Sequence, residues 1–134
     1  MDSCIFCKIV KGEIPSYRVW EDEQYFAFLD IFPIKEGHTM VIPKRHKGYL
    51  FDLEDQELEG LIKASKKVSQ ILKDAFNPKT GRIGVMVYGL DVDHVHVHLV
   101  PLDKPGDLSF ANKYAASQTE LQAALNKIKK VLQV

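Results

Sequence analysis

Two periodicities of apolar and polar residues run along the chain and predict its elements of secondary structure. Short runs rich in β-branched and aromatic residues, bounded by turn residues, are typical of strands. Such runs lie at Arg18–Glu21, Tyr25–Asp30, His38–Pro43, Ile83–Tyr88 and His94–Pro101. A short helix is expected over residues 4–11, ahead of Gly12 and Pro15.

The helical period dominates two longer segments. In Leu53–Phe76, apolar or small residues recur at spacings of three and four, with Asp52 as the expected N-cap. The last helix is expected to start at Ser117, which forms a capping box with Glu120. Residues 102–116, between the last expected strand and this helix, are expected to be a loop or an ordered tail. Five strands and two main helices predict an α+β fold with a mostly antiparallel sheet.

Composition and charge restrict the class of protein. No internal repeat or linker divides the 134 residues, so residues 1–134 are expected to form one domain. Eighteen Lys and Arg balance eighteen Asp and Glu, so the basic excess typical of nucleic-acid binders is missing, and a small ligand is favoured. No apolar run reaches the ~18 residues that a membrane helix needs, nor does the start resemble a signal peptide. We expect a cytoplasmic protein without a nucleic-acid or membrane partner.

Three of the five histidines, His94, His96 and His98, alternate with aliphatic residues. In a strand, alternate side chains share a face, so the imidazoles are expected to point one way and the aliphatic residues into the core. Three neighbouring imidazoles cannot all be protonated cheaply, and a neutral imidazole suits nucleophilic attack on phosphorus. Spacing alone leaves two alternatives open, a zinc-ligand set and incidental surface residues.

Cys4 and Cys7 are the only cysteines of the chain. They are too few for the disulfide framework of a secreted protein. Thiols two residues apart suit zinc, but one pair supplies only half of a tetrahedral shell. Free buried thiols are the alternative.

Four segments together resemble a known family. The segment from His94 to Val100 follows the pattern His-φ-His-φ-His-φ-φ, where φ is apolar, and Cys4–Ser16, Phe28–Ile31 and Gly37–His46 precede it in order. These segments resemble the histidine triad (HIT) family, in particular its small nucleotide-binding and nucleotide-hydrolysing branch. The resemblance covers residues 4–101 and implies a HIT-like fold.

The resemblance also implies a reaction. It predicts a nucleotide hydrolase or transferase that acts on the α-phosphate of nucleoside phosphoramidates, aminoacyl adenylates or dinucleoside polyphosphates. A nucleotidyl-histidine intermediate would form, and a nucleoside monophosphate would be released. A purine nucleotide of AMP type is the expected substrate and a homodimer the expected assembly. A weakly active nucleotide- or zinc-binding regulatory module of the same fold is the alternative.

Individual roles follow from the same resemblance. His96, the middle histidine, matches the nucleophile, His98 matches a phosphate contact, and His94 matches a residue that braces the nucleophile or binds zinc. Asp30 matches the acid that grips the ribose hydroxyls. The remaining residues assigned to the substrate site are Ile31, Ile5, Phe6, Ile14, Met40, His38 and Gly89. Relatives that bind zinc complete the cysteine pair with two histidines, which implies a site of Cys4, Cys7, His46 and His94.

The link ahead of the triad departs from the family pattern. Many members end this link in Gly-Gln-Ser/Thr-Val, whereas Leu90 and Asp91 stand here in place of Gln and Ser/Thr. A carboxylate near a phosphate would repel it. We interpret Asp91 as a turn residue; an aspartate that orients a histidine is the alternative.

Overall fold

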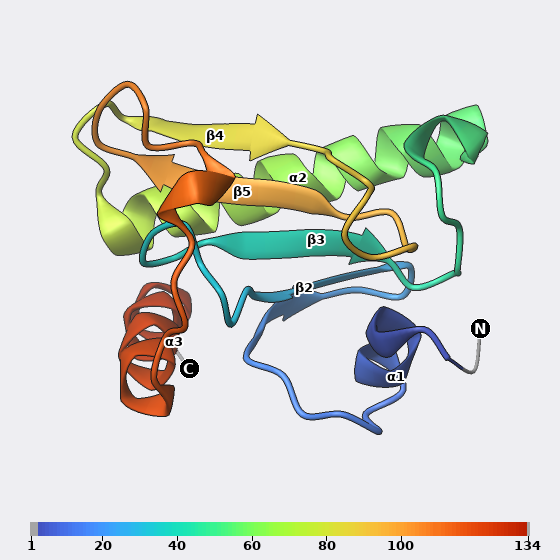
Figure 1. Ribbon diagram of the computed structural model, residues 1–134, viewed down its shortest axis with the longest axis horizontal. Helices are drawn as coiled ribbons and strands as arrows, with labels where there is room; N and C mark the ends of the chain where they lie inside the picture. Colours follow the sequence, from blue (N-terminus) through green and yellow to red (C-terminus); the bar gives the residue numbers. More distant parts are fainter. Residues whose placement is uncertain (1–2, 134) are drawn as a thin grey trace.

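The computed structural model describes residues 3–133 and contains one five-stranded sheet (Figure 1). Its strands lie in the order β1-β2-β3-β5-β4, and every neighbouring pair is antiparallel. The strands are β1 (Arg18–Glu21), β2 (Tyr25–Leu29), β3 (Thr39–Pro43), β4 (Arg82–Met86) and β5 (Val97–Leu102). The predicted α+β architecture is therefore confirmed.

Three α-helices surround the sheet. They are α1 (Ile5–Val10), α2 (Asp55–Phe76) and α3 (Gln118–Leu132), with single turns of 3₁₀ helix at η1 (Leu50–Asp52) and η2 (Phe110–Asn112). Helix α2 packs on β2 to β5, while α3 packs on α2 and β1 (Figure 1). No helix within residues 3–133 is long and apolar enough to cross a membrane.

The two faces of the sheet bury different sets of residues. The α2 face carries the larger core, formed with residues such as Ala27, Val41 and Leu99. The opposite face packs against α1 through a smaller cluster of Phe6, Ile9, Phe26, Phe28, Met40 and Ile42. Across the strands, Phe28 pairs with Met40 and Met40 pairs with His98. His98 therefore lies on the α1 face, which holds the candidate site.

Several predicted boundaries were wrong, and each has a local cause. Regular pairing of β5 begins at Val97 rather than His94, because the chain bends through 91–94 and the His94 amide donates to the Val92 carbonyl. The alternation nevertheless continues through the bend, since Val95 lies in the large core and His94 and His96 do not.

The other corrections concern β4 and α2. Strand β4 spans Arg82–Met86 instead of Ile83–Tyr88. The N-cap of α2 is Glu54 rather than Asp52, because Leu50–Asp52 already forms η1. The capping box of Ser117 and Glu120 is present as predicted.

Candidate active site

A cavity of about 290 Å³ lies on the α1 face of the sheet. Its wall is largely apolar, with two carboxylates and one ammonium group. It is lined by Ile5, Phe6, Ile9, Ile14, Pro15, Ser16, Phe28, Leu29, Asp30, Ile31, Phe32, Met40, Asp91, Val92 and Lys113. Six residues assigned to the substrate site from the sequence lie in this wall, whereas Gly89 and His38 do not. An apolar pocket with a few polar groups is typical of a small-ligand site.

The His96 ring is fully buried beside this cavity, and its two nitrogens have different partners. Nδ1 lies 2.6 Å from the backbone carbonyl of His94, and Nε2 lies 3.0 Å from Oδ1 of Asp91. Because a carbonyl only accepts, Nδ1 must carry a proton and donate it. Nε2 is thus the His96 nitrogen that can act on a ligand.

A relay of hydrogen bonds fixes the protons of His38 and His98. The Ile34 amide donates to His38 Nδ1 over 2.9 Å, and His38 Nε2 lies 2.9 Å from His98 Nδ1. Because His38 accepts at Nδ1, its proton is on Nε2, which donates to His98. Neutral His98 then carries its proton on Nε2. Within residues 3–133, His98 Nε2 is the one buried side-chain nitrogen or oxygen without a hydrogen-bond partner, so the relay leaves an oriented donor free for a ligand.

Burial keeps both histidines of this relay neutral. It lowers the pKa of His38 to about 3, helped by the positive charge of Lys113 and by the neighbouring His96. It lowers the pKa of His98 to about 4, helped by His38 and His96. Both imidazoles are uncharged at pH 7, as the relay requires.

These lowered pKa values predict that acid destabilises the fold. The unfolded chain binds protons near pH 6.5 and the folded chain only near pH 4, so stability is complete above pH 6.5 and is lost as the pH falls towards 4. Asp30, Asp91, His96 and Lys113 also face the His38–His98 pair. We expect the free energy of unfolding, measured with urea, to fall by about 5 kcal/mol between pH 7 and 4.5, about half of it from each histidine. His38→Asn should flatten this profile; identical profiles for both proteins would contradict the account.

Asp91 does not act as a turn residue alone, which corrects the interpretation from the sequence. Its Oδ1 lies 3.0 Å from His96 Nε2 and its Oδ2 lies 4.0 Å from His98 Nε2. Partial burial raises the pKa of the Asp91 carboxyl, but His96 and the backbone amides of Asp91 and Val92 outweigh it, so the net pKa is lowered. An ionised carboxylate therefore lies directly over the nucleophile candidate.

The ligand atoms of Asp91, His96 and His98 lie within 4.8 Å of one another, which is close enough for a metal ion to be considered. A metal needs the lone pair of each imidazole nitrogen that binds it. The relay from Ile34 instead places a proton on His98 Nε2. His98 Nε2 is consequently a hydrogen-bond donor here and does not offer the lone pair that a metal would need.

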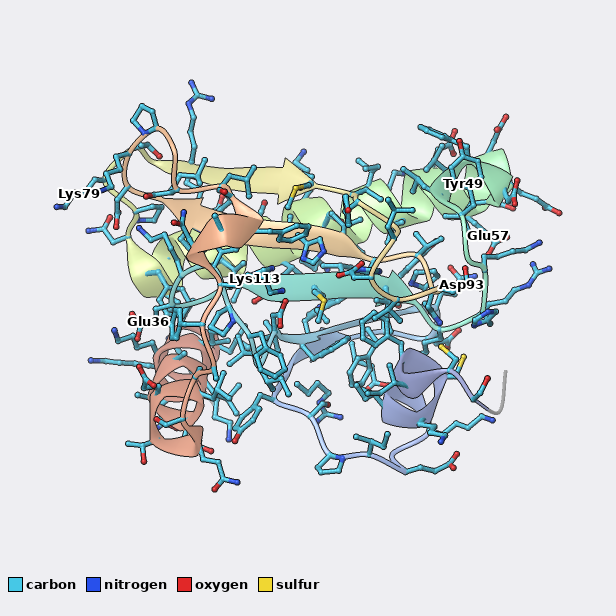
Figure 2. All side chains as sticks on the ribbon, in the orientation of Figure 1. Glu36, Tyr49, Glu57, Lys79, Asp93 and Lys113 are labelled. Carbon is cyan, nitrogen blue, oxygen red and sulfur yellow. The ribbon has the colours of Figure 1, made fainter. Side chains whose placement is uncertain are left out.

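Asp30 lies at the far end of β2, buried in the wall of the cavity. Its Oδ1 accepts from the Phe32 amide over 2.8 Å, and its Oδ2 lies 3.1 Å from Lys113 Nζ. Figure 2 shows Lys113 in front of the sheet, where the chain runs from η2 towards α3. Neither Lys113 nor Phe110, whose ring packs edge-on to His98 at 5.4 Å, was predicted from the sequence as a site residue. Both lie in the segment predicted only as a loop or an ordered tail.

The four residues of the proposed zinc site lie together at the start of α1, where two sulfur atoms lie close together (Figure 2). His94 Nδ1 is 3.3 Å from Cys4 Sγ and 3.6 Å from Cys7 Sγ, and His46 Nδ1 is 3.3 Å from Cys7 Sγ. Tetrahedral zinc binds sulfur at about 2.3 Å and nitrogen at about 2.0 Å, which places a sulfur and a nitrogen ligand about 3.6 Å apart. His94 Nε2 donates to the Pro43 carbonyl over 2.8 Å, so the Nδ1 lone pair faces the sulfurs. The residues present therefore fit zinc.

Comparisons with known proteins identify the family of the chain. The sequence profile of the HIT domain matches residues 11–105. An adenosine 5'-monophosphoramidase of Candida albicans is 42% identical over 110 residues, which cover 74% of this chain and 70% of that protein.

Two solved structures extend the similarity to the fold. A HIT-like protein of Bartonella henselae superposes with a TM-score of 0.83 at 32% identity, covering 98% of both chains. A zinc-bound histidine triad protein of Mycobacterium smegmatis gives 0.79 at 27% identity, covering 98% of this chain and 97% of the other. The histidine cluster, the sheet and these relatives show that the chain belongs to the histidine triad family.

Proposed function

We propose that this protein is a nucleotide hydrolase or transferase that forms a covalent nucleotidyl intermediate on His96. One observation carries the proposal: Nδ1 of His96 is engaged by a carbonyl, while Nε2 lies in one cluster with the unpartnered Nε2–H of His98 and with Asp91, which lines a ligand-sized cavity. A nucleophile next to a fixed donor for a phosphate oxygen is the arrangement that transfer at phosphorus requires.

The reaction proceeds in two displacements. In the first, His96 Nε2 releases to solvent the proton that it donates to Asp91 and forms a bond to the α-phosphorus, while the bond from phosphorus to the leaving group breaks. The leaving group departs with the electron pair and takes a proton from solvent. In the second, water attacks phosphorus, the bond to Nε2 breaks, and the nucleoside monophosphate leaves as water gives up its proton. The His98 Nε2–H stabilises the phosphoryl oxygens in both steps.

The substrate class follows from the cavity and the relatives. We assign the apolar wall, including Ile5, Ile14 and Met40, to a purine base, and buried Asp30 to the ribose hydroxyls. The Candida albicans relative is named an adenosine 5'-monophosphoramidase. Nucleoside phosphoramidates are accordingly the first substrates to test, followed by aminoacyl adenylates and dinucleoside polyphosphates.

We propose that Cys4, Cys7, His46 and His94 hold a structural zinc ion. The ion would cross-link α1 to the bend that carries the histidines. Since the His94 carbonyl also holds His96 Nδ1, the cluster positions the nucleophile.

An exposed apolar edge of the sheet supports the proposal of a homodimer. Strand β4 is an edge strand that exposes Val85, and the segment that continues it exposes Val87, Tyr88 and Leu90. Edge strands with exposed apolar residues are prone to pair with another chain, and we propose a homodimer through this edge. We further propose that residues 1–134 work as one HIT domain in the cytoplasm, without a nucleic-acid or membrane partner.

Replacing Asp30 tests the binding mode. We expect Asp30→Asn to lower kcat/KM for adenosine 5'-phosphoramidate by roughly 10- to 100-fold, because a charged hydrogen bond to ribose is lost. The loss should be small for the 2',3'-dideoxy substrate, which lacks the hydroxyls. Asp74→Asn, on the exposed face of α2, is the matched control. Equal losses on both substrates would contradict the assignment of Asp30 to ribose.

One observation favours the alternative of a weakly active nucleotide-binding module. The Asp91 carboxylate covers His96 Nε2, and an anionic substrate must displace it. Binding of AMP without turnover of any phosphoramidate or dinucleoside polyphosphate would support that alternative.

A further inference from the structure

The carboxylate of Asp91 stands where the reacting phosphoryl group must approach. We propose that Asp91 is a specificity-determining residue: it selects substrates whose leaving group is positively charged and disfavours those that leave as a polyphosphate. The inference rests on the proposed function and deepens it, because it names the charge of the group that His96 displaces.

Asp91 blocks the direction from which phosphorus must reach His96 Nε2. Asp91 Oδ1 lies 3.0 Å from His96 Nε2, the distance of a hydrogen bond. Because the ionised carboxylate can only accept, Nε2 donates this hydrogen bond, and Asp91 Oδ1 lies in the direction in which Nε2 points. Phosphorus must approach Nε2 along this same direction, because displacement at phosphorus is in line. Asp91 and the phosphoryl group therefore cannot occupy their positions together.

The Asp91 carboxylate has room to move aside. The Asp91 side chain is 38% exposed, whereas His96 and His98 beneath it are fully buried. Next to it in sequence, Leu90 is 79% exposed, and Gly89 has open space around its Cα with a φ of +80°. The Asp91 side chain can thus move outwards, away from the rings of His96 and His98. In-line displacement places the leaving group on that same outer side, opposite Nε2, so the displaced carboxylate faces the leaving group.

The displaced carboxylate acts on the leaving group through its charge. The charged groups that line the cavity are Asp30, Asp91 and Lys113. Asp30 and Lys113 are paired at 3.1 Å, and His96, the partner of Asp91, becomes engaged by phosphorus. Asp91 is then the charge left to act on the leaving group. At about 6 Å and a dielectric between those of protein and water, one unit charge changes a rate about tenfold. The Asp91 carboxylate therefore attracts a leaving group that carries an ammonium group and repels a leaving polyphosphate.

Two matched substrates test this selection. Adenosine 5'-phosphoramidates with an N-butyl and an N-(3-aminopropyl) leaving group have the same length and differ in one charge. In the wild-type protein at low salt, kcat/KM should be about tenfold higher for the aminopropyl substrate. In Asp91→Asn the ratio of kcat/KM for the aminopropyl substrate to that for the butyl substrate should fall to near one. The kcat/KM for diadenosine tetraphosphate should rise relative to both. Asp91→Glu should restore a ratio above one. A general defect in folding or catalysis lowers both rates equally and leaves the ratio unchanged.

Equilibrium binding tests the position of the carboxylate without turnover. Because Asp91 competes with phosphate for His96 and His98, Asp91→Asn should bind AMP about tenfold more tightly by calorimetry. Its affinity for adenosine, which has no phosphate, should not change. An AMP affinity equal to that of the wild-type protein would overturn the proposed position.

The outcomes separate the two proposals. If the wild-type protein hydrolyses neither phosphoramidate, the proposed function fails, and selection of the leaving group fails with it. If both are hydrolysed and the ratio is the same in wild-type and Asp91→Asn proteins, the proposed function stands and the role of Asp91 is overturned.

Discussion

His96→Asn is expected to lower kcat for adenosine 5'-phosphoramidate by on the order of 10⁴-fold, the size of effect that removal of a covalent nucleophile produces. The asparagine amide is polar and smaller than imidazole, so the buried position stays filled, but it offers no nucleophilic ring nitrogen. Affinity for AMP should change only a few-fold, because His98 and Asp30 are retained. Steady-state release of AMP and calorimetry measure the two quantities.

The matched control for this experiment is His38→Asn. It removes a histidine that is equally buried but lies behind His98 in the relay. Turnover should fall by roughly 10- to 100-fold as the donor on His98 loses its fixed direction. Equal losses in the two variants would mean that His96 has no special role in the chemistry.

Cys7→Ser is expected to abolish zinc binding and to lower the free energy of unfolding by about 3 kcal/mol, which corresponds to a fall in Tm of roughly 10 °C. Serine oxygen is a poor substitute for a thiolate on zinc. Without metal, burial raises the pKa of the Cys7 thiol, and a hydrogen bond with Cys4 adds to this effect. Zinc would therefore bind with release of a proton. Elemental analysis and thermal unfolding provide the measurements.

A chelator supplies the control for the zinc prediction. It should lower the Tm of the wild-type protein to that of Cys7→Ser and leave the variant unchanged. Turnover should fall in parallel, because the cluster holds His94 and the His94 carbonyl orients His96. Wild-type protein that carries no zinc, and whose Tm does not respond to added zinc, would contradict a structural metal site.

The elements of the fold could be read from the sequence wherever one face of a segment is buried. The alternation in Tyr25–Leu29 and Thr39–Pro43 separates two cores, and the helical period of Asp55–Phe76 matches one apolar stripe. The predicted ends of strands and helices were wrong where the backbone forms a local turn. Short-range hydrogen bonds form the bend at His94, where a strand was predicted to begin, and the turn η1, where the cap of α2 was predicted. The hydrophobic pattern does not indicate such local turns.

The candidate site divides in the same way. Residues within the contiguous histidine, aspartate and cysteine motifs could be assigned, because the resemblance fixes them by position. Lys113 meets Asp30 from 83 positions away and Phe110 meets His98 through a loop turn, so neither has a local signal. The proton on His98 depends on the direction of one backbone amide, that of Ile34, which only the folded chain reveals.

Asp91 shows why a departure from a family pattern is informative only in three dimensions. The sequence indicates a turn aspartate, since Asp91 follows Gly89 and Leu90 in the short link between two predicted strands. In the fold the same turn places its carboxylate on His96. The residue that weakens the resemblance is thus the one that contacts the nucleophile candidate.

Mass spectrometry of the intact protein tests the central claim most directly. The protein is quenched without acid during turnover of adenosine 5'-phosphoramidate, because a phosphorus–nitrogen bond to histidine is labile in acid. The account predicts a transient mass increase equal to one adenylyl group in the wild-type protein, absent from His96→Asn. Turnover and adduct formation that persist undiminished in His96→Asn would contradict it.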